Sequence, residues 1–314
     1  MQERGETMVF ASFIGDSLAL GVHWIYDAGR IAGEFGRVEQ LLKPREDSCH
    51  PTKDRGEFTH YGDQMFVLLQ SVAATKGLDL HDFFRRWQEL FRDYKGYYDG
   101  ATKGTIRQIA KGKDLGEAGS PSNDLAGAAR IAPLLYCYRN DLDSLVRAAR
   151  AQTKMTHTDP ATIDSAEFFA RVTFKTLGGA SPTVAIREVA KEHFADSTIS
   201  EWVQDGIDSR DMESVAAVGK LGQSCHTPDA FPSVVHLIVK YERNLQEALI
   251  QSVMAGGDSA ARGMIVGMVL GAHLGKGGLP EEWIAGLKKG EEIRSLLDQL
   301  RSPAVEIRAP GPAW

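Results

Sequence analysis

Apolar residues recur along this chain at helical spacing, about every 3.6 residues, and no segment shows the period of two typical of a half-buried strand. The pattern and its start signals predict helices over Thr7–Leu20, Asp63 to about Thr75, His81–Tyr94, Leu125–Tyr138, Leu142–Lys154, Pro160–Leu177 and a segment ending at Met254. We therefore expect an all-α fold. No linker divides the chain, so residues 1–314 are expected to form a single compact multi-helix domain.

Capping residues mark several helix starts, because their side chains accept hydrogen bonds from the backbone of the first turn. A proline at the first helical position, or a glutamate three residues after the cap, strengthens the signal. These pairs are Asp159–Pro160, Ser181–Pro182 and Asn244–Glu247. Two polar segments, Lys43–Tyr61 and Lys111–Asn123, predict loops, which are often functional at this length. The proline-containing tail, residues 301–314, is expected on the surface.

The stretch Ala255–Gly275, AGGDSAARGMIVGMVLGAHLG, places two glycines and an aspartate before an apolar segment. Asp258 is predicted to cap the helix that follows. Gly256 and Gly257 are expected to let the backbone approach whatever lies at that helix end. Glycines then recur every four residues along one helix face and predict close packing; they are Gly263, Gly267, Gly271 and Gly275. The segment is too short and too interrupted to span a membrane.

Net charge and cysteine spacing indicate which partners and which cellular compartment to expect. The formal net charge of −6 at pH 7 argues against a nucleic-acid partner, which requires a basic face. Cys49, Cys137 and Cys225 are widely spaced and form no C-x-x-C pattern, so a reduced, cytoplasmic setting is expected. The first residues, MQERGETMVF, have no signal-peptide pattern. We expect no membrane partner, and the oligomeric state stays open.

Four places gather polar groups in apolar or glycine-rich context: Gly15–Trp24, His60–Gln64, Thr156–Pro160 and the loop at Asp258. An aspartate inside an apolar helix is costly to bury unless it is paired, so Asp16 is predicted either to pair with a neighbouring element or to serve a site. For Asp63, capping of its own helix is the commoner role. For His157, packing is commoner than ligation.

Two acidic helix starts far apart in the sequence suggest a ligand site. Asp63 and Asp258 are candidates to face one cleft and share a hard cation such as magnesium, which prefers oxygen ligands. The alternative is a zinc-type set whose spacings match no recognised zinc pattern, made of His23, His60, His157, His226 and Cys225.

Five ordered segments together resemble the ADP-ribosylglycohydrolase family, an all-α family that includes the jellyfish J1-crystallins. The segments are GDSLALGVHWIYD at Gly15–Asp27, HYGDQMFVLLQSVA at His60–Ala73, SNDLAGAARIAPLL at Ser122–Leu135, MTHTDP at Met155–Pro160 and the glycine-rich Ala255–Gly275. The family has TDDT in the second segment and GGDTDT in the fifth. The resemblance covers nearly the whole chain and implies the family's fold, in a divergent branch similar to the J1-crystallins.

The resemblance also implies two magnesium ions held between the TDDT and GGDTDT segments, where they position water for cleavage at C1″ of ADP-ribose. This chain keeps Asp63 and Asp258 at those segments, and Ser259 stands for a threonine. The family's ligands are replaced at Tyr61, Gly62, Gln64, Ala260 and Ala261. Two carboxylates cannot balance two divalent ions, so we expect no bimetallic centre and at most one weakly held magnesium at Asp63 and Asp258.

Arg262 suggests a substitute for the missing metal charge. It lies four residues after Asp258, so both can share one helix face. We expect its guanidinium to pair with Asp258 or Asp63 in the place of a metal. The alternative is an ordinary helix-surface ion pair, which contributes little.

The resemblance suggests a site between the two helix starts. Asp63 or Asp258 is expected to position water, with His23 or His157 as the acid–base group. The residues expected to bind substrate are Asp16, His60, Tyr61, Gly62, Gln64, Asn123, Gly256, Gly257, Ser259 and Arg262.

Two functions from different classes follow. The first is a divergent hydrolase that cleaves an N- or O-glycosidic bond of an ADP-ribosyl or related substrate, either a small molecule or an ADP-ribosylated partner. The second is a catalytically inactive relative that binds a ligand or serves as a structural, crystallin-like protein. The fold does not decide between them, because function depends on the site.

Overall fold

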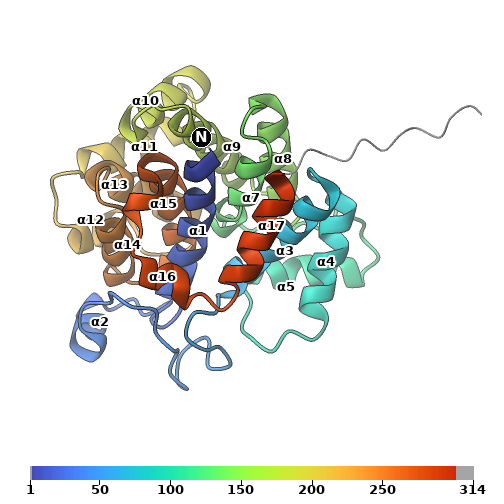
Figure 1. Cartoon of the computed structure of the whole chain (residues 1–314), viewed down its shortest axis with the longest axis horizontal. Coiled ribbons are helices and arrows are strands. Elements are labelled where there is room, and N and C mark those ends of the chain that lie inside the picture. Colours follow the sequence, from blue (N-terminus) through green and yellow to red (C-terminus); the bar gives the residue numbers. More distant parts are fainter. Residues whose placement is uncertain (1, 302–314) are drawn as a thin grey trace, which may run out of the picture.

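The computed structural model describes residues 2–301, and all regular elements in that range are helices (Figure 1). The predicted all-α class is confirmed, and the helices pack into a single compact domain. Their bounds are α1 Gln2–Ala19, α2 Ala28–Phe35, α3 His60–Thr75, α4 Leu80–Arg92, α5 Gly100–Ala110, α6 Ala126–Ala129, α7 Ala132–Cys137, α8 Leu142–Lys154, α9 Pro160–Leu177, α10 Pro182–His193, α11 Thr198–Asp208, α12 Ser214–Leu221, α13 Thr227–Lys240, α14 Leu245–Met254, α15 Ser259–Leu274, the short 3₁₀ helix η1 Gly275–Gly278, α16 Glu281–Gly286 and α17 Gly290–Arg301. The expected surface tail lies outside the described residues, apart from Arg301.

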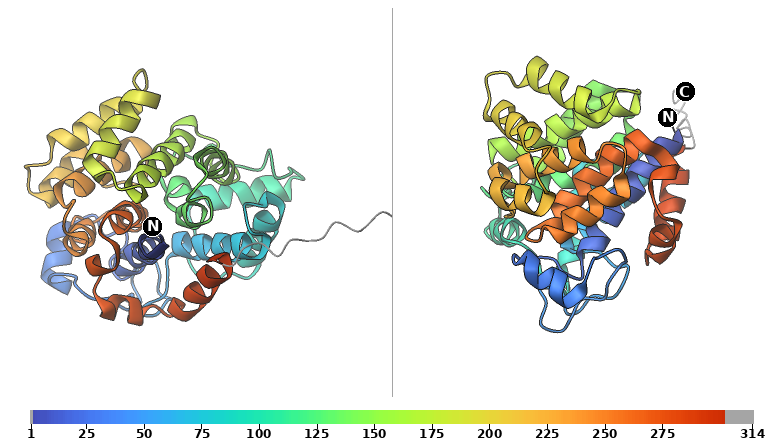
Figure 2. Two further views of the ribbon diagram at one scale, coloured as in Figure 1. Left: turned by 45° about the horizontal axis from the view of Figure 1, so that its top comes forward. Right: turned by 90° about the vertical axis from the view of Figure 1, so that its left-hand side faces the viewer.

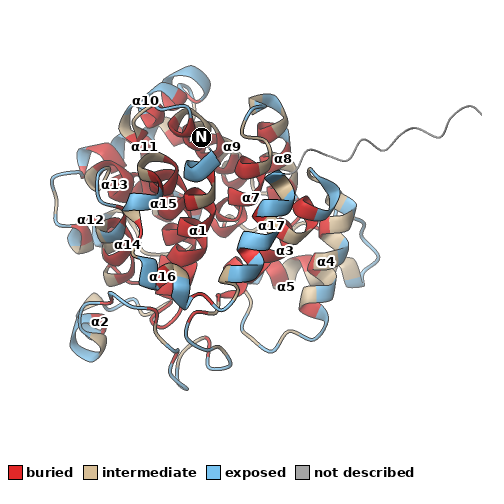
Figure 3. Ribbon diagram, in the orientation of Figure 1, coloured by how far each residue is buried: buried red, intermediate tan, exposed pale blue. Residues whose placement is uncertain are grey.

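Helices α1 and α15 cross the middle of the molecule, and most of their residues are buried (Figure 3). A Cβ on Gly15 would lie 2.2 Å from the carbonyl oxygen of Gly263, and one on Gly267 would lie 2.2 Å from that of Ala11. Only glycine lets the two backbones approach this closely, so the predicted close packing of the glycine face is confirmed. Gly275 has a different role, because it ends α15 with a φ of 65°.

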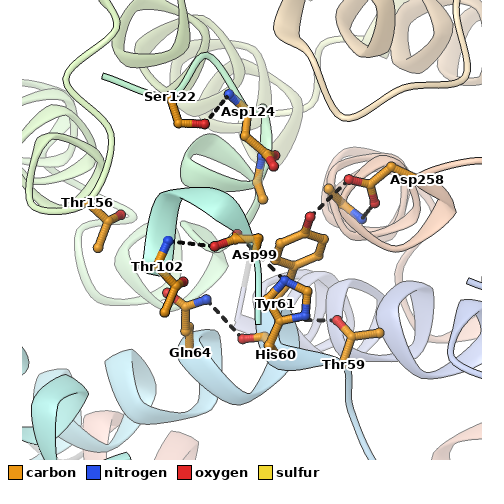
Figure 4. Close-up of polar contacts among 12 residues, drawn as sticks. Thr59, His60, Tyr61, Gln64, Asp99, Thr102, Ser122, Asp124, Thr156 and Asp258 are labelled. Atoms are coloured by element: carbon orange, nitrogen blue, oxygen red, sulfur yellow. Dashed lines mark hydrogen bonds and ion pairs between the residues drawn. The ribbon is translucent and has the colours of Figure 1, made fainter. Parts of the chain in front are cut away.

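The remaining helices surround this central pair. Helices α10–α13 lie on one side of it and α3–α5 on the other, as the further views show (Figure 2). The N-terminal ends of α3, α5, α6 and α15 come together across the centre, and the candidate site lies there (Figure 4). None of the helices within residues 2–301 is long and apolar enough to cross a membrane.

Helix bounds agree with prediction where local capping sets them. Helix α9 covers Pro160–Leu177 as expected, and the Asp159 carboxylate accepts a hydrogen bond from the Thr162 backbone at 3.0 Å. Helix α8 covers Leu142–Lys154 as expected, with Asp141 as its cap. Asp258 caps α15, and its carboxylate accepts from the Ala261 backbone.

Two predictions of helix bounds near the site were wrong. The expected helix Leu125–Tyr138 is broken into α6 and α7, because Pro133 has no N–H and its ring would clash with the carbonyl of Ala129 four residues earlier. Helix α3 begins at His60, so the expected loop ends two residues early. Its cap is Thr59, whose hydroxyl accepts from the Tyr61 backbone at 3.1 Å. Asp63 therefore lies inside the first turn and is not the cap.

Some helices had no strong signal in the sequence and were not predicted. They are α2, α5, α11, α12, α13, α16 and α17. Helix α5 matters most for the site, because its N-cap Asp99 contributes a buried carboxylate.

Candidate active site

The loop before α15 is clamped by the chain's own backbone. Gly256 and Gly257 have φ values of 70° and 68°, which favour glycine. A Cβ on Gly256 would lie 2.5 Å from the carbonyl oxygen of Ile25, and one on Gly257 would lie 2.1 Å from that of Gln223. What lies at this helix end is therefore Ile25 and Gln223, and the two glycines shape the loop by packing against protein.

Asp258 is fully buried and hydrogen-bonded through both oxygens. Nε2 of His23 lies 2.9 Å from Oδ1, and the Tyr61 hydroxyl donates to Oδ2 at 3.0 Å. Burial alone would raise the pKa of this carboxyl, but the hydrogen bonds and the charge of its neighbours outweigh burial and lower it. Asp258 is therefore held as a carboxylate.

Asp124 faces Asp258 from the loop before α6. Together with Cys225 these residues form the group within residues 2–301 whose ligand-type atoms all lie within 4.8 Å of one another. Burial, with the negative charges of Asp258 and Asp99 added to it, raises the pKa of Asp124 well above its usual range. The site thus pairs a carboxyl that favours its neutral form with one that favours its ionised form. Figure 4 shows the Tyr61 ring beside both.

A second polar group lies on the other side of Tyr61. Nε2 of His60 is 3.6 Å from Oδ2 of Asp99, whose other oxygen accepts from the Thr102 backbone at 2.6 Å and caps α5. Burial would raise the pKa of Asp99, but the contact with His60 outweighs it and lowers the pKa. His157 lies nearby; burial lowers its pKa to about 3, and its Nε2 is buried with no hydrogen-bond partner in the described structure.

Asp63 has partners of its own. Its Oδ2 lies 2.5 Å from the Lys53 ammonium nitrogen and accepts from the Tyr94 hydroxyl at 2.6 Å. The structure therefore gives Asp63 and Asp258 different partners. The ammonium of Lys53 supplies the positive charge at Asp63.

Arg262 does not pair with either aspartate, contrary to expectation. Its Nη2 donates to the backbone oxygens of Ser252 and Gly256, both at 2.6 Å, and Nε donates to the Ser252 hydroxyl. No ion pair within residues 2–301 joins it to Asp258 or Asp63. The guanidinium instead fastens the end of α14 to the loop before α15, since it is buried and faces carbonyl groups.

Several other residues that we expected to bind substrate make contacts that hold the fold together. Asp16 accepts from the Thr59 backbone at 2.8 Å, the Thr59 hydroxyl and the Gly62 backbone, so it holds the start of α3. A Cβ on Gly62 would lie 2.5 Å from Oδ2 of Asp16, which explains the glycine. Burial raises the pKa of Asp16 to about 6. The interpretation in which Asp16 caps a neighbouring element is confirmed.

The polar residues Gln64, Asn123 and Ser259 differ in their surroundings. Gln64 accepts from Trp87 and Arg130 and so belongs to a buried network. Asn123 pairs with His226, with 2.6 Å between its Oδ1 and the histidine Nδ1. The Ser259 hydroxyl is buried with no partner in the described structure.

A magnesium shared by Asp63 and Asp258, as expected from the sequence, does not fit their surroundings. Lys53 already occupies Asp63, and both oxygens of Asp258 accept hydrogen bonds. The group whose atoms lie close enough to hold a cation is Asp124, Asp258 and Cys225, and the Cys225 thiol is a soft donor that a hard cation disfavours and whose pKa burial raises. The zinc-type set of four histidines with Cys225 is wrong as a cluster, because within residues 2–301 the ligand-type atoms that all lie within 4.8 Å of one another belong to Asp124, Cys225 and Asp258.

The site contains residues that the sequence did not single out, namely His50, Asp99 and Asp124. Asp124 stands in the SNDLAG segment that carries the family resemblance, so that segment held a signal. Asp99 precedes a glycine at a helix start and looks only like a cap. His50 lies in the long loop after α2 and reaches His23 with 2.8 Å between His50 Nε2 and His23 Nδ1.

Comparisons with known proteins show which sequences and which fold this chain resembles. A family model described as ADP-ribosylglycohydrolase matches residues 1–308. Crystallin J1A of Tripedalia cystophora is 24% identical, covering 95% of this chain and 96% of its own length. The human ADP-ribosylhydrolase ARH3 is 22% identical, covering 84% of each chain. A solved structure titled ADP-ribosylglycohydrolase-related protein complex shares the fold, with a TM-score of 0.76 at 23% identity over 95% of this chain and 97% of that one.

Proposed function

The chain belongs to the ADP-ribosylglycohydrolase family, and from that premise we propose that it is a magnesium-independent hydrolase that cleaves an N- or O-glycosidic bond of an ADP-ribosyl or related substrate. The substrate is a small molecule or an ADP-ribosylated partner. The proposal includes the cytoplasmic setting expected from the three free cysteines.

The observation that carries the proposal is the pair Asp124 and Asp258. Glycosidic hydrolysis needs one carboxyl that donates a proton to the leaving group and one carboxylate that stabilises the positive charge developing at C1″. Two neighbouring carboxyls whose surroundings move their pKa values in opposite directions suit these two roles. Asp124 favours the neutral form and Asp258 the ionised form.

Two neighbouring residues support these roles for Asp124 and Asp258. Tyr61 and His23 hydrogen-bond to Asp258 and hold it in place. The C1″ bond breaks as its electrons pass to the leaving atom, which takes the proton of Asp124. Water then adds its hydroxyl to C1″ and gives its remaining proton to the Asp124 carboxylate, so the carboxyl is restored and one water is consumed. This scheme differs from the roles expected from sequence, in which Asp63 or Asp258 positions water.

The second candidate is a ligand-binding or structural protein without turnover. The observation that favours it is the capture of Asp63 by Lys53, together with Ala260 and Ala261, which provide no side-chain oxygen. The similarity to crystallin J1A points the same way. A thermal shift with ADP-ribose and no hydrolysis would favour this candidate.

Hydrolysis assays decide between the two. ADP-ribosyl-arginine, ADP-ribosyl-serine and O-acetyl-ADP-ribose should each be tested with the full chain, once with EDTA and once with magnesium. We expect turnover of at least one substrate in EDTA and a loss of about 10²- to 10⁴-fold in Asp124→Asn, since general acid catalysis contributes that much. The exposed Asp205→Asn is the control. No turnover of any substrate would overturn the proposal.

A further inference from the structure

One thiol and two carboxyl groups come together at the candidate site. They belong to Asp124, Cys225 and Asp258, and their ligand-type atoms all lie within 4.8 Å of one another. Asp124 and Cys225 lie outside the two segments that hold magnesium ligands according to the family resemblance, so this donor set differs from the one that the resemblance implies. We call the three residues the thiol–carboxylate cluster.

Backbone hydrogen bonds fix the three segments that carry the thiol–carboxylate cluster. The Leu125 N–H donates to the Cys225 carbonyl at 2.9 Å, and the Asp258 N–H donates to the Gln223 carbonyl at 2.8 Å. The loop of residues 223–225 is therefore bonded to both segments that carry an aspartate. Ligands that are held in place before binding lose less conformational entropy when they bind, so the cluster is prepared for an ion.

Asp258 is oriented by two neighbours that leave it able to ligate an ion. Nε2 of His23 lies 2.9 Å from Oδ1, and the Tyr61 hydroxyl donates to Oδ2 at 3.0 Å. A carboxylate oxygen has two lone pairs, so Oδ2 can accept from Tyr61 with one and bind an ion with the other. Hydrogen bonds of this kind orient the carboxylates of metal sites. A four-coordinate ion needs one such oxygen, whereas six-coordinate magnesium needs further oxygen donors.

The donor types in the cluster select the class of ion. A thiolate is a soft ligand that favours zinc over magnesium, and zinc accepts sulfur and carboxylate oxygen together. Zinc bonds of about 2.0–2.3 Å put tetrahedral ligand atoms roughly 3.5 Å apart, so the side chains need to close by roughly 1 Å around the ion. Asp124 and Asp258 are buried, but Cys225 is half-buried and gives an ion a path from solvent.

Proton release keeps the buried charge constant when an ion binds. A thiol and a neutral carboxyl group must lose their protons before they ligate a metal. Asp124 favours its neutral form, and burial together with the two neighbouring carboxyl groups raises the pKa of the Cys225 thiol. Each of these two residues therefore releases one proton to solvent as one divalent ion enters. The exchange leaves no additional uncompensated charge in the buried site.

We propose that Asp124, Cys225 and Asp258 bind a zinc-class divalent cation and that the bound ion inhibits the hydrolase. The binding stands on the cluster alone, whereas the inhibition rests on the proposed hydrolase function. A bound ion takes the place of the Asp124 proton and offsets the charge of the Asp258 carboxylate. The acid and the carboxylate that hydrolysis requires are then both unavailable, so turnover stops until the ion leaves.

Cobalt(II) tests the binding with the full chain. Tetrahedral cobalt absorbs visible light, and a cobalt–thiolate bond adds a charge-transfer band in the near ultraviolet. We expect both signals in the wild type, and we expect zinc to remove them by displacing cobalt. Cys225→Ser should lose the charge-transfer band and bind zinc at least about 100-fold more weakly, since even outer-shell partners of a metal contribute about 10- to 100-fold.

Cys137→Ser is the matched control for this measurement. Cys137 is also half-buried, but its charged neighbours are Arg139 and Lys76 and not carboxylates. This variant should give both cobalt signals at wild-type strength. No cobalt signal in the wild type, or an unchanged charge-transfer band in Cys225→Ser, would overturn the site.

Alkylation gives a second readout that needs no variant. Iodoacetamide labels free thiols, and mass spectrometry of the resulting peptides reports on each cysteine separately. Zinc should slow the labelling of Cys225 by at least about 10-fold, because a metal-bound sulfur is no longer a free nucleophile, and should leave the labelling of Cys137 unchanged. Equal protection of the two cysteines, or protection of neither, would overturn ligation by Cys225.

Turnover separates the inhibition from the proposed hydrolase function. In a chain that hydrolyses a substrate in EDTA, zinc should lower kcat by at least about 10-fold, and EDTA should restore it. Cys225→Ser should need about 100-fold more zinc for the same loss. Full wild-type turnover with the cluster saturated by zinc would overturn the inhibition. A wild-type chain without turnover would overturn the proposed function and the inhibition together, and the cobalt and alkylation results would still decide the binding.

Discussion

The ammonium nitrogen of Lys53 lies 2.5 Å from Oδ2 of Asp63, in the first turn of α3. The two side chains are only 13% and 10% exposed. The family resemblance implies a divalent cation at this helix start, and here the chain supplies a cation from its own loop. Unlike a metal ion, a lysine beside a carboxylate needs no further ligands to complete its coordination. It therefore suits a segment in which the family's other metal ligands are replaced.

Removing this ammonium should destabilise the fold. We expect Lys53→Met to cost about 1–3 kcal/mol in urea unfolding, less than for a fully buried pair because Tyr94 still donates to Asp63. Lys53→Met combined with Asp63→Asn should recover part of that loss. The matched control is Lys113→Met, whose partner Glu117 is 66% exposed, and it should cost less than about 0.5 kcal/mol. Equal costs at the two lysines would contradict this account.

Magnesium should not stabilise the protein. A ligand at 100 times its Kd adds about 2.7 kcal/mol to the unfolding free energy, a shift that thermal unfolding detects readily. Because Lys53 occupies Asp63 and Asp258 is hydrogen-bonded through both oxygens, we expect Tm to be the same in millimolar magnesium and in EDTA. A rise in Tm that saturates with magnesium would show that a metal site exists.

Acid should destabilise the protein through its buried neutral histidines. The pKa of His157 is about 3 in the folded chain and about 6.5 in the unfolded chain. The unfolded state therefore binds more protons below pH 6.5, and stability falls as pH falls through that window. At pH 5 the loss from His157 is about 2 kcal/mol. Asp16 works in the opposite direction, since its raised pKa of about 6 costs stability as pH rises from 3.8 through 6.

Substitution of His157 separates its contribution to the pH dependence of stability from that of Asp16. The cost of His157→Gln, measured by urea unfolding, should be about 2 kcal/mol smaller at pH 5 than at pH 7, because the variant has no histidine to protonate there. His81→Gln, at the exposed surface of α4, controls for the substitution itself. A cost of His157→Gln that stays constant with pH would contradict the burial of a neutral ring.

Local signals explain which parts of the fold were predictable. Helix α9 was predicted at both ends, because Asp159 and Pro160 mark its start and two glycines, Gly178 and Gly179, follow its last residue. The break between α6 and α7 was missed because Pro133 stands in an apolar segment that looks continuous. Helix α5 begins after Asp99 without a strong apolar pattern, so nothing local indicated it.

The candidate site was predictable only in part. Asp258, His23, His60, Tyr61 and His157 were singled out, and the structure places all five in the buried core. The partners that give Asp258 its chemistry were not accessible from sequence, since Asp124 lies 134 residues away and meets it only through the packing of α6 and α15. Lys53 likewise comes from a loop whose path no periodicity describes.

The contact between α1 and α15 should tolerate no added methyl group. A Cβ on Gly267 would lie 2.2 Å from the carbonyl oxygen of Ala11, so Gly267→Ala must push two buried backbones apart. We expect a loss of about 3 kcal/mol or more in urea unfolding, at the upper end for overpacking.

Gly33→Ala is the matched control for this prediction. Gly33 lies inside α2, and a Cβ there would meet nothing within 4 Å. Alanine should stabilise that helix by about 0.5–1 kcal/mol, because it loses less backbone entropy than glycine. The two substitutions add the same methyl group to a helix, so opposite signs isolate the effect of interhelix contact. If Gly267→Ala also stabilised the protein, the two central helices would have to lie further apart than the structure places them.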